Sequence, residues 1–190
     1  MIIEDKHLIL CFDSLINYYD NNHKLTSINN DNNDKYPMFV TWNHNSRLRG
    51  CIGTFKSIEL IKGLRQYSLI SALEDKRFDP INLTILNDLS VSISILHNFK
   101  KKLDCFDFKI GLEGIKIDFY HNNRHYQSTF LPNVLTEQNW TKEQSIVAAI
   151  KKSGYRQKID KDLYNGINLE TFESEYKSMS YKNYLFLVNL

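Results

Sequence analysis

The chain has 190 residues, of which 42% are hydrophobic and 24% charged, and its formal net charge is +2. This length and composition predict one globular domain whose core needs no disulfide or metal to hold it together. The charge balance disfavours nucleic acids and anionic membranes as partners, because proteins that bind them usually carry a clustered basic excess.

Three cysteines, Cys11, Cys51 and Cys105, are too few and too scattered for a disulfide framework, and no C-x-x-C pair suggests zinc. The first residues lack the features of a signal peptide, and no apolar run approaches the roughly 20 residues of a membrane span. We therefore expect an intracellular protein, cytoplasmic and/or nuclear, with no metal and no membrane partner.

The first quarter of the chain predicts a helix, a loop and a hairpin. Apolar residues recur at helical spacing over residues 4–20, and an Asn- and Asp-rich stretch over 21–34 predicts a mobile loop. From Tyr36 to Trp42 the apolar period changes to two, which predicts a strand. A turn over Asn43–Ser46 then leads into a second predicted strand, Arg47–Thr54.

The next segments predict a helix, a strand and a loop. Ser57 is a suitable N-cap for a helix that carries apolar residues as far as Leu73, and Pro80 closes this region. Residues Leu89–Ile95 alternate apolar side chains with serines, which is the clearest strand pattern in the chain. Residues 98–109 are predicted to form a loop.

The second half predicts another hairpin, Gly114–Tyr120 with Arg124–Leu131, followed by a helix. That helix begins at a capping box made by Thr141 and Gln144, and Gly154 suits its C-terminal cap.

The tail, residues 167–190, predicts one or two strands. The chain as a whole, residues 1–190, is predicted to form a single domain.

The most distinctive segment is Leu48–Gly53, in which one cysteine stands between two glycines. In an extended conformation Arg49, Cys51 and Gly53 would share one face of the strand. Gly50, Ile52 and Thr54 would lie on the opposite face. Glycine within a strand usually marks a bend or the close approach of another group. We therefore predict a ligand site here, with these residues: Arg49, Gly50, Cys51, Ile52, Gly53 and Arg77.

The sequence allows three interpretations of Cys51. It can be a buried structural thiol, since free cysteine packs well as a small hydrophobe. It can line a ligand pocket. It can also be a catalytic nucleophile, because Arg47 and Arg49 would favour the thiolate. No histidine is placed by spacing alone to act as its base.

A second segment, Asp75–Pro80, alternates charges before a proline at the end of the predicted helix. It is either a solvated turn or the rim of a pocket in which Arg77 binds a carboxylate or phosphate through two hydrogen bonds. No phosphate-loop, dinucleotide-binding or zinc-protease motif is present, so no cofactor is predicted.

The unbroken Leu-Arg-Gly-Cys-Ile-Gly segment at Leu48–Gly53 resembles the hallmark of the AMMECR-type domain family. This family is named after a human chromosomal region linked to Alport syndrome with midface hypoplasia and elliptocytosis. The eukaryotic branch fits best. Further segments match in order: Cys11–Asp13, Tyr36–Trp42, Ser71–Leu73, Arg77–Phe78, Ser90–Ser92, Gly114–Ile117, Thr129–Pro132, Glu137–Trp140 and Lys152–Tyr155.

The resemblance implies an α+β fold of two intertwined lobes, with a largely antiparallel sheet, packed helices and a cleft near the cysteine segment. It implies no particular reaction. The chain departs from the family pattern at Glu113, where relatives commonly carry a histidine, and at Asp79, where they carry a proline.

Three functions follow as hypotheses. The preferred one is a binding or interaction module for a small molecule or protein partner, with its cleft around Leu48–Gly53. The alternative is an enzyme that uses Cys51 as a nucleophile on a small-molecule substrate. Nucleic-acid binding is the weakest, because the charge is nearly balanced.

Overall fold

A computed structural model describes residues 2–25 and 34–188. The chain divides into two compact units, residues 1–96 with 175–190 (unit 1) and residues 97–174 (unit 2). Unit 1 thus combines both ends of the chain, and unit 2 is inserted between them in the sequence, so the structure has the two lobes that the resemblance implies. The predicted mobile loop over 21–34 lies mostly outside the described residues.

The elements of unit 1 are, in chain order, α1 (Asp5–Tyr19), β1 (Lys35–His44), β2 (Arg47–Glu59), α2 (Leu60–Leu73), the 3₁₀ helix η1 (Leu83–Asp88), the start of β3 (Leu89–Lys102), the end of β6 (Asn168–Ser180) and α6 (Tyr181–Val188). Those of unit 2 are the end of β3, β4 (Gly114–His121), β5 (Arg124–Phe130), α3 (Pro132–Glu137), α4 (Lys142–Lys152), α5 (Lys161–Asn165) and the start of β6.

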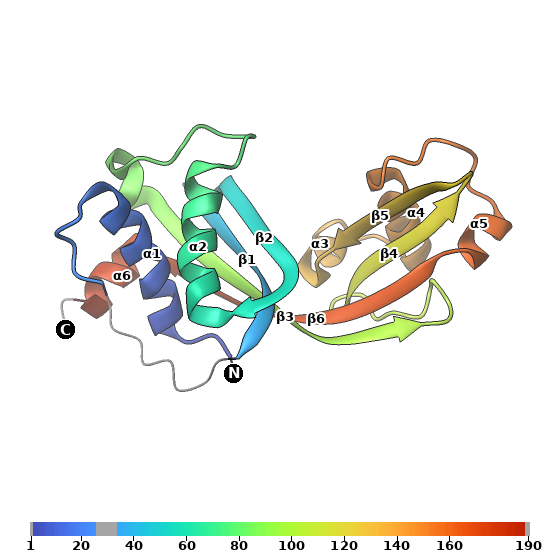
Figure 1. Cartoon of the computed structure of the whole chain (residues 1–190), viewed down its shortest axis with the longest axis horizontal. Coiled ribbons are helices and arrows are strands. Elements are labelled where there is room, and N and C mark those ends of the chain that lie inside the picture. Colours follow the sequence, from blue (N-terminus) through green and yellow to red (C-terminus); the bar gives the residue numbers. More distant parts are fainter. Residues whose placement is uncertain (1, 26–33, 189–190) are drawn as a thin grey trace. The chain divides into compact units, whose positions relative to one another are not determined.

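The strands follow the order β2-β1-β3-β6-β4-β5 (Figure 1). The pairs β1–β2, β1–β3, β4–β5 and β4–β6 are antiparallel. The predicted α+β class with a largely antiparallel sheet is therefore confirmed. None of the described helices is long and apolar enough to cross a membrane.

Both predicted hairpins form, and each closes through two residues with positive φ. Asn45 and Ser46 have φ values of 49° and 62°, and Asn122 and Asn123 have values of 49° and 59°. Two consecutive residues in the left-handed region make the turn whose twist matches paired strands, and asparagine tolerates that region better than most residues.

The core of unit 1 lies where α1 and α2 pack on one face of the β1–β2 hairpin (Figure 1). Trp42 is fully buried, and its indole N–H donates to the Ser68 carbonyl oxygen of α2 at 2.9 Å. Phe12 of α1 meets the Trp42 ring edge-on, with 5.2 Å between ring centroids. The apolar side of the helix predicted over residues 4–20 and the strand predicted over Tyr36–Trp42 therefore pack into the same core.

The core of unit 2 forms between the β4–β5 hairpin and α4, whose residues Ile146, Ala149 and Ile150 are fully buried. The predicted capping box is present. Thr141 Oγ1 accepts from the Gln144 N–H at 3.2 Å, and Gln144 Oε1 accepts from the Thr141 N–H at 2.8 Å. Gly154, with φ of 90°, follows the helix as predicted.

Two predicted boundaries near the ends of strands are wrong. Ser57 does not cap α2. It lies within β2, because pairing with β1 continues to Glu59, and α2 begins one residue later. Residues 98–102 belong to β3 instead of a loop. Most of these residues are exposed, so they carry no apolar alternation that would reveal a strand.

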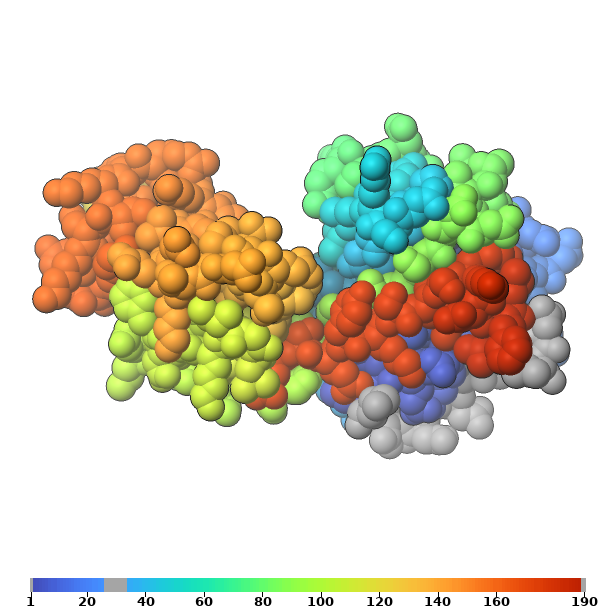
Figure 2. Space-filling model, turned by 180° about the vertical axis from the view of Figure 1, so that it is seen from behind, coloured from blue at the N-terminus to red at the C-terminus, as the bar shows by residue number. Residues whose placement is uncertain are grey.

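The tail contains one strand, which lies within the prediction, and it ends in a helix that was not predicted. It forms one strand, β6, and then the helix α6, which lies beside α1 (red and blue in Figure 2). Tyr184 of α6 is buried, and its hydroxyl donates to the buried Asp13 Oδ1 of α1 at 2.8 Å. This hydrogen bond joins residues 171 positions apart, so no local sequence pattern can predict it.

Candidate functional site

The cysteine segment lies in β2, the edge strand of the sheet. Cys51 stands opposite Thr41 of β1, and Gly50 stands opposite the buried Trp42. Because neighbouring residues of a strand point to opposite faces, the Gly50 position faces the core and Cys51 faces away from it. This alternation is the one that the sequence predicts.

Both glycines of the segment allow another group to approach closely. A Cβ atom at Gly50 would overlap the Ser71 carbonyl oxygen of α2. A Cβ atom at Gly53 would overlap the Met38 carbonyl oxygen and the ring of Phe39. Gly50 therefore sets how closely α2 packs on β2, and Gly53 sets how closely β1 approaches the same strand.

Asp75 and Arg77 clamp the backbone of Cys51. The Cys51 N–H donates to Asp75 Oδ2 at 2.9 Å, and the Cys51 carbonyl oxygen accepts from Arg77 Nη2 at 3.1 Å. Arg77 Nε and Nη2 donate to Asp75 Oδ1 and Oδ2 at 2.9 and 2.6 Å. The two side chains thus bind the backbone groups of Cys51 that a neighbouring strand would otherwise bind. This protects the exposed edge of the sheet from pairing with another strand.

The charges of this clamp stabilise each other. The Arg77 side chain, which hydrogen-bonds the buried Asp75 carboxylate, holds the pKa of Asp75 well below its ordinary value, and the Cys51 N–H lowers it further. Burial opposes this shift. Hydrogen bonding to Asp75 in turn raises the pKa of Arg77. The pair therefore stays ionised at neutral pH.

The thiol of Cys51 differs from the other two thiols in its surroundings. Cys51 is half-buried, and the Thr41 hydroxyl donates to its Sγ at 3.1 Å. Cys11 and Cys105 are buried. Burial raises the pKa of both, to about 11 for Cys105. Cys51 is therefore the most accessible of the three thiols to a reagent.

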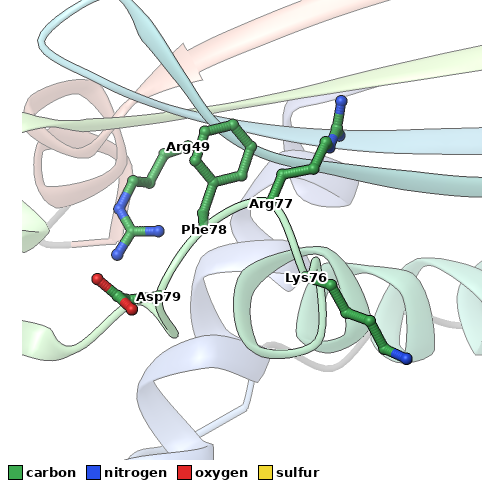
Figure 3. A pocket seen from close by; sticks show the side chains of 5 residues that line it. All are labelled: Arg49, Lys76, Arg77, Phe78 and Asp79. Atoms are coloured by element: carbon green, nitrogen blue, oxygen red, sulfur yellow. The ribbon is translucent and has the colours of Figure 1, made fainter.

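A pocket of about 420 Å³ lies beside the clamp, lined by Arg49, Lys76, Arg77, Phe78 and Asp79 (Figure 3). Arg49 comes from β2, and the other four residues come from the turn that follows α2. The Phe78 ring lies between Arg49 and Arg77, and the Arg77 guanidinium carbon is 5.4 Å from the ring centroid. The lining holds three cations and one carboxylate.

Arg49, one of the lining residues, has a buried hydrogen-bond donor without a partner among the described residues. Its Nη2 donates to the Pro80 carbonyl oxygen in a long contact of 3.4 Å. Its Nη1 is buried and has no hydrogen-bond partner within the described parts of the chain. A buried guanidinium nitrogen without an acceptor costs free energy, so this donor calls for an explanation.

The structure brings only part of the predicted site together. Arg49 and Arg77 line the pocket, and Cys51 joins them through its backbone bond to Arg77. Gly50, Ile52 and Gly53 are not among the lining residues.

Sequence reasoning missed Asp75, although the dense charges of Asp75–Pro80 marked its segment. The signal that could have identified Asp75 was a carboxylate two residues before Arg77. The described residues contain no group of three or more His, Cys, Asp or Glu side chains that could hold a metal ion.

Glu113, a position at which the chain departs from the expected family pattern, is buried in unit 2. Its Oε1 accepts from the Thr171 hydroxyl at 3.2 Å, and its Oε2 accepts from the Lys109 N–H at 2.7 Å. These bonds give Glu113 a structural role, because they tie the loop before β4 to β6.

The fold and the clamped edge strand define an α+β protein with a glycine-flanked cysteine segment beside a basic pocket. The AMMECR1 family model matches residues 8–177 of this chain. The chain therefore belongs to the AMMECR1 family, as the segment Leu48–Gly53 indicates.

Relatives and a solved structure agree with this assignment. An uncharacterized protein of Arabidopsis thaliana is 36% identical over 184 residues, which cover 93% of this chain and 85% of the plant protein. One of Saccharomyces cerevisiae is 36% identical over 181 residues, covering 81% and 72%. These relatives fit the eukaryotic branch. The crystal structure of an uncharacterized Pyrococcus horikoshii protein shares the fold, with a TM-score of 0.71, 22% identity and 93% of each chain covered.

Proposed function

We propose that this protein is a binding module whose pocket beside Cys51 takes a small ligand with a carboxylate or phosphate group. The observation that carries the proposal is the buried Arg49 Nη1, which has no acceptor within the described residues and belongs to a pocket-lining side chain. Lys76 and Arg77 belong to the same lining, in which Asp79 is the one carboxylate, and Asp75 beside the pocket pairs with Arg77. Planar guanidinium groups match the geometry of carboxylate and phosphate oxygens.

The shape and the rigidity of the pocket support the same function. Its volume of about 420 Å³ falls within the range of roughly 300–1,000 Å³ typical of small-molecule sites. The Phe78 ring lies between the two arginines, and the exposed lining of the pocket is mostly polar, which suits an anionic ligand. Arg77 is held by Asp75 and by the Cys51 carbonyl oxygen, so little side-chain entropy would be lost when it meets a ligand.

Replacement of Arg49 tests this function. We expect titration with inorganic phosphate or malonate, followed by NMR of the arginine side chains, to shift the signals of Arg49 and Arg77 in the wild-type protein. Arg49→Gln should weaken binding at least tenfold, because hydrogen bonds to charged groups contribute about 1.5–3 kcal/mol. Arg47→Gln is the matched control, since Arg47 is exposed and lies outside the pocket lining. Equal binding by both variants would contradict the proposal.

The alternative function, an enzyme with Cys51 as nucleophile, is favoured by the hydroxyl of Thr41 at the sulfur and by the half-exposed position of the thiol. We expect iodoacetamide to label Cys51 first in the folded protein, because Cys11 and Cys105 are buried. Mass spectrometry of peptides identifies the labelled site. A labelling rate that is already maximal below pH 7 would support the enzyme, whereas a rate that keeps rising near the ordinary thiol value of about 8.5 would count against it.

We also propose that the protein works in the cytoplasm and/or the nucleus, where thiols stay reduced. All three cysteines are free, which suits such a compartment. Fluorescence microscopy of the tagged chain tests this, and a signal confined to the secretory pathway would contradict it.

A further inference from the structure

The outer face of α4 carries a second pocket, far in sequence from Cys51. Its volume is about 360 Å³, and its mostly apolar lining consists of Trp140, Glu143, Gln144, Val147, Ala148 and Lys151. The opposite face of the same helix packs on β5, with Ile146, Ala149 and Ile150 fully buried. Val147 and Ala148 are only half-buried. The helix therefore presents apolar surface on both sides, although one side alone serves the core.

The charges on this outer face are arranged symmetrically about Val147. Glu143 lies four residues before Val147 and Lys151 lies four residues after it, about 6 Å along the helix in each direction. Both side chains are exposed, and neither forms an ion pair within the described residues. Two antiparallel copies of α4, related by a two-fold axis through Val147, would place each Glu143 opposite a Lys151.

The C-terminal end of α4 leaves space beside this face. A Cβ atom at Gly154, two residues beyond the helix, would meet no heavy atom within 4 Å. At the centre, Ala148 is small enough to let two helices approach closely.

We infer that the outer face of α4 (Trp140, Glu143, Gln144, Val147, Ala148 and Lys151) is a self-association surface that binds a second copy of this chain. The dimer is antiparallel and two-fold symmetric, with two Glu143–Lys151 ion pairs around the Val147 contact. One helix face buries much less than the roughly 800 Å² per partner of a standard stable interface, so association is weak and reversible. This inference does not depend on the anion pocket of unit 1.

Sedimentation equilibrium of the full chain between 10 and 1,000 µM tests the inference. We expect a concentration-dependent monomer–dimer equilibrium. Glu143→Lys and Lys151→Glu should each raise the dimer Kd about tenfold, because each creates two like-charge contacts across the two-fold axis. The double variant Glu143→Lys with Lys151→Glu should return the Kd to within about threefold of the wild-type value, since both ion pairs re-form with opposite polarity.

The control is Lys62→Glu, which makes the same charge change on the exposed side of α2. It should leave the dimer Kd unchanged, and circular dichroism should show that all variants are folded. A chain that stays monomeric over the whole concentration range overturns the inference. A dimer whose Kd is insensitive to Glu143 and Lys151 overturns it as well, because the interface would then lie elsewhere.

Discussion

Gly50→Ala should lower the free energy of unfolding by about 3 kcal/mol or more, the largest effect that we expect from adding one methyl group to this chain. The reason is the overlap of the new Cβ atom with the Ser71 carbonyl oxygen. That oxygen belongs to the backbone of α2, so it cannot rotate away, and the helix would have to move off the strand. Urea unfolding followed by circular dichroism measures the effect.

Gly166→Ala is the control for this prediction. A Cβ atom at Gly166 would lie 3.5 Å from the Leu163 carbonyl oxygen, which is an ordinary contact, and its φ of −87° suits alanine. The change should stay within about 0.5 kcal/mol. An unfolding midpoint for Gly50→Ala that equals the wild-type midpoint would show that the close contact with α2 does not form.

The same unfolding curves test the proposal that residues 1–190 form a single domain. The strands β3 (Leu89–Lys102) and β6 (Asn168–Ser180) each begin in one unit and end in the other. Loss of either unit would therefore disrupt strands of the other, and we expect one transition for the wild-type protein. Two separate transitions would contradict the single domain.

Asp75→Asn should destabilise the protein by about 2 kcal/mol at pH 7. The variant keeps the size of the side chain but loses the charge that pairs with Arg77 and strengthens the bond from the Cys51 N–H. Because Arg77 is 57% exposed, solvent screens part of the ion pair, which limits the expected loss. Urea unfolding of both proteins gives the difference.

The difference in stability between the wild-type protein and Asp75→Asn should decrease at low pH. The pKa of Asp75 is lowered in the folded protein, so its carboxylate stabilises the fold above the unfolded pKa of about 3.9. That contribution is lost as the pH falls from about 4 towards the folded pKa. The gap between the wild-type protein and Asp75→Asn should therefore be full at pH 7 and 5 and smaller at pH 3.

Asp79→Asn serves as the control, since Asp79 is exposed and lies only four residues further along the same turn. It should leave stability within about 0.5 kcal/mol of the wild-type value at each pH. If Asp75→Asn behaves like Asp79→Asn, the clamp on Cys51 contributes nothing to stability.

The local patterns of this sequence determine most of its elements. Alternation from Tyr36 to Trp42, the turn residues Asn45 and Ser46, and the capping box at Thr141 each depend on residues within a few positions. Each of these elements forms because its residues favour the required backbone conformation and because its apolar side chains are buried on one face. The wrong boundaries, at Ser57 and at residues 98–102, lie where pairing with another strand extends an element beyond its own pattern.

By itself, the sequence also determined the family of this protein and the face on which Cys51 lies, because Leu48–Gly53 is contiguous and a strand alternates strictly. Only the tertiary structure decided that Asp75 and Arg77 bond to the backbone of Cys51, and that Arg49 shares a pocket with Phe78. These contacts join residues 24–29 positions apart. They arise because Gly50 lets α2 pack closely on β2, a distance that no local pattern encodes.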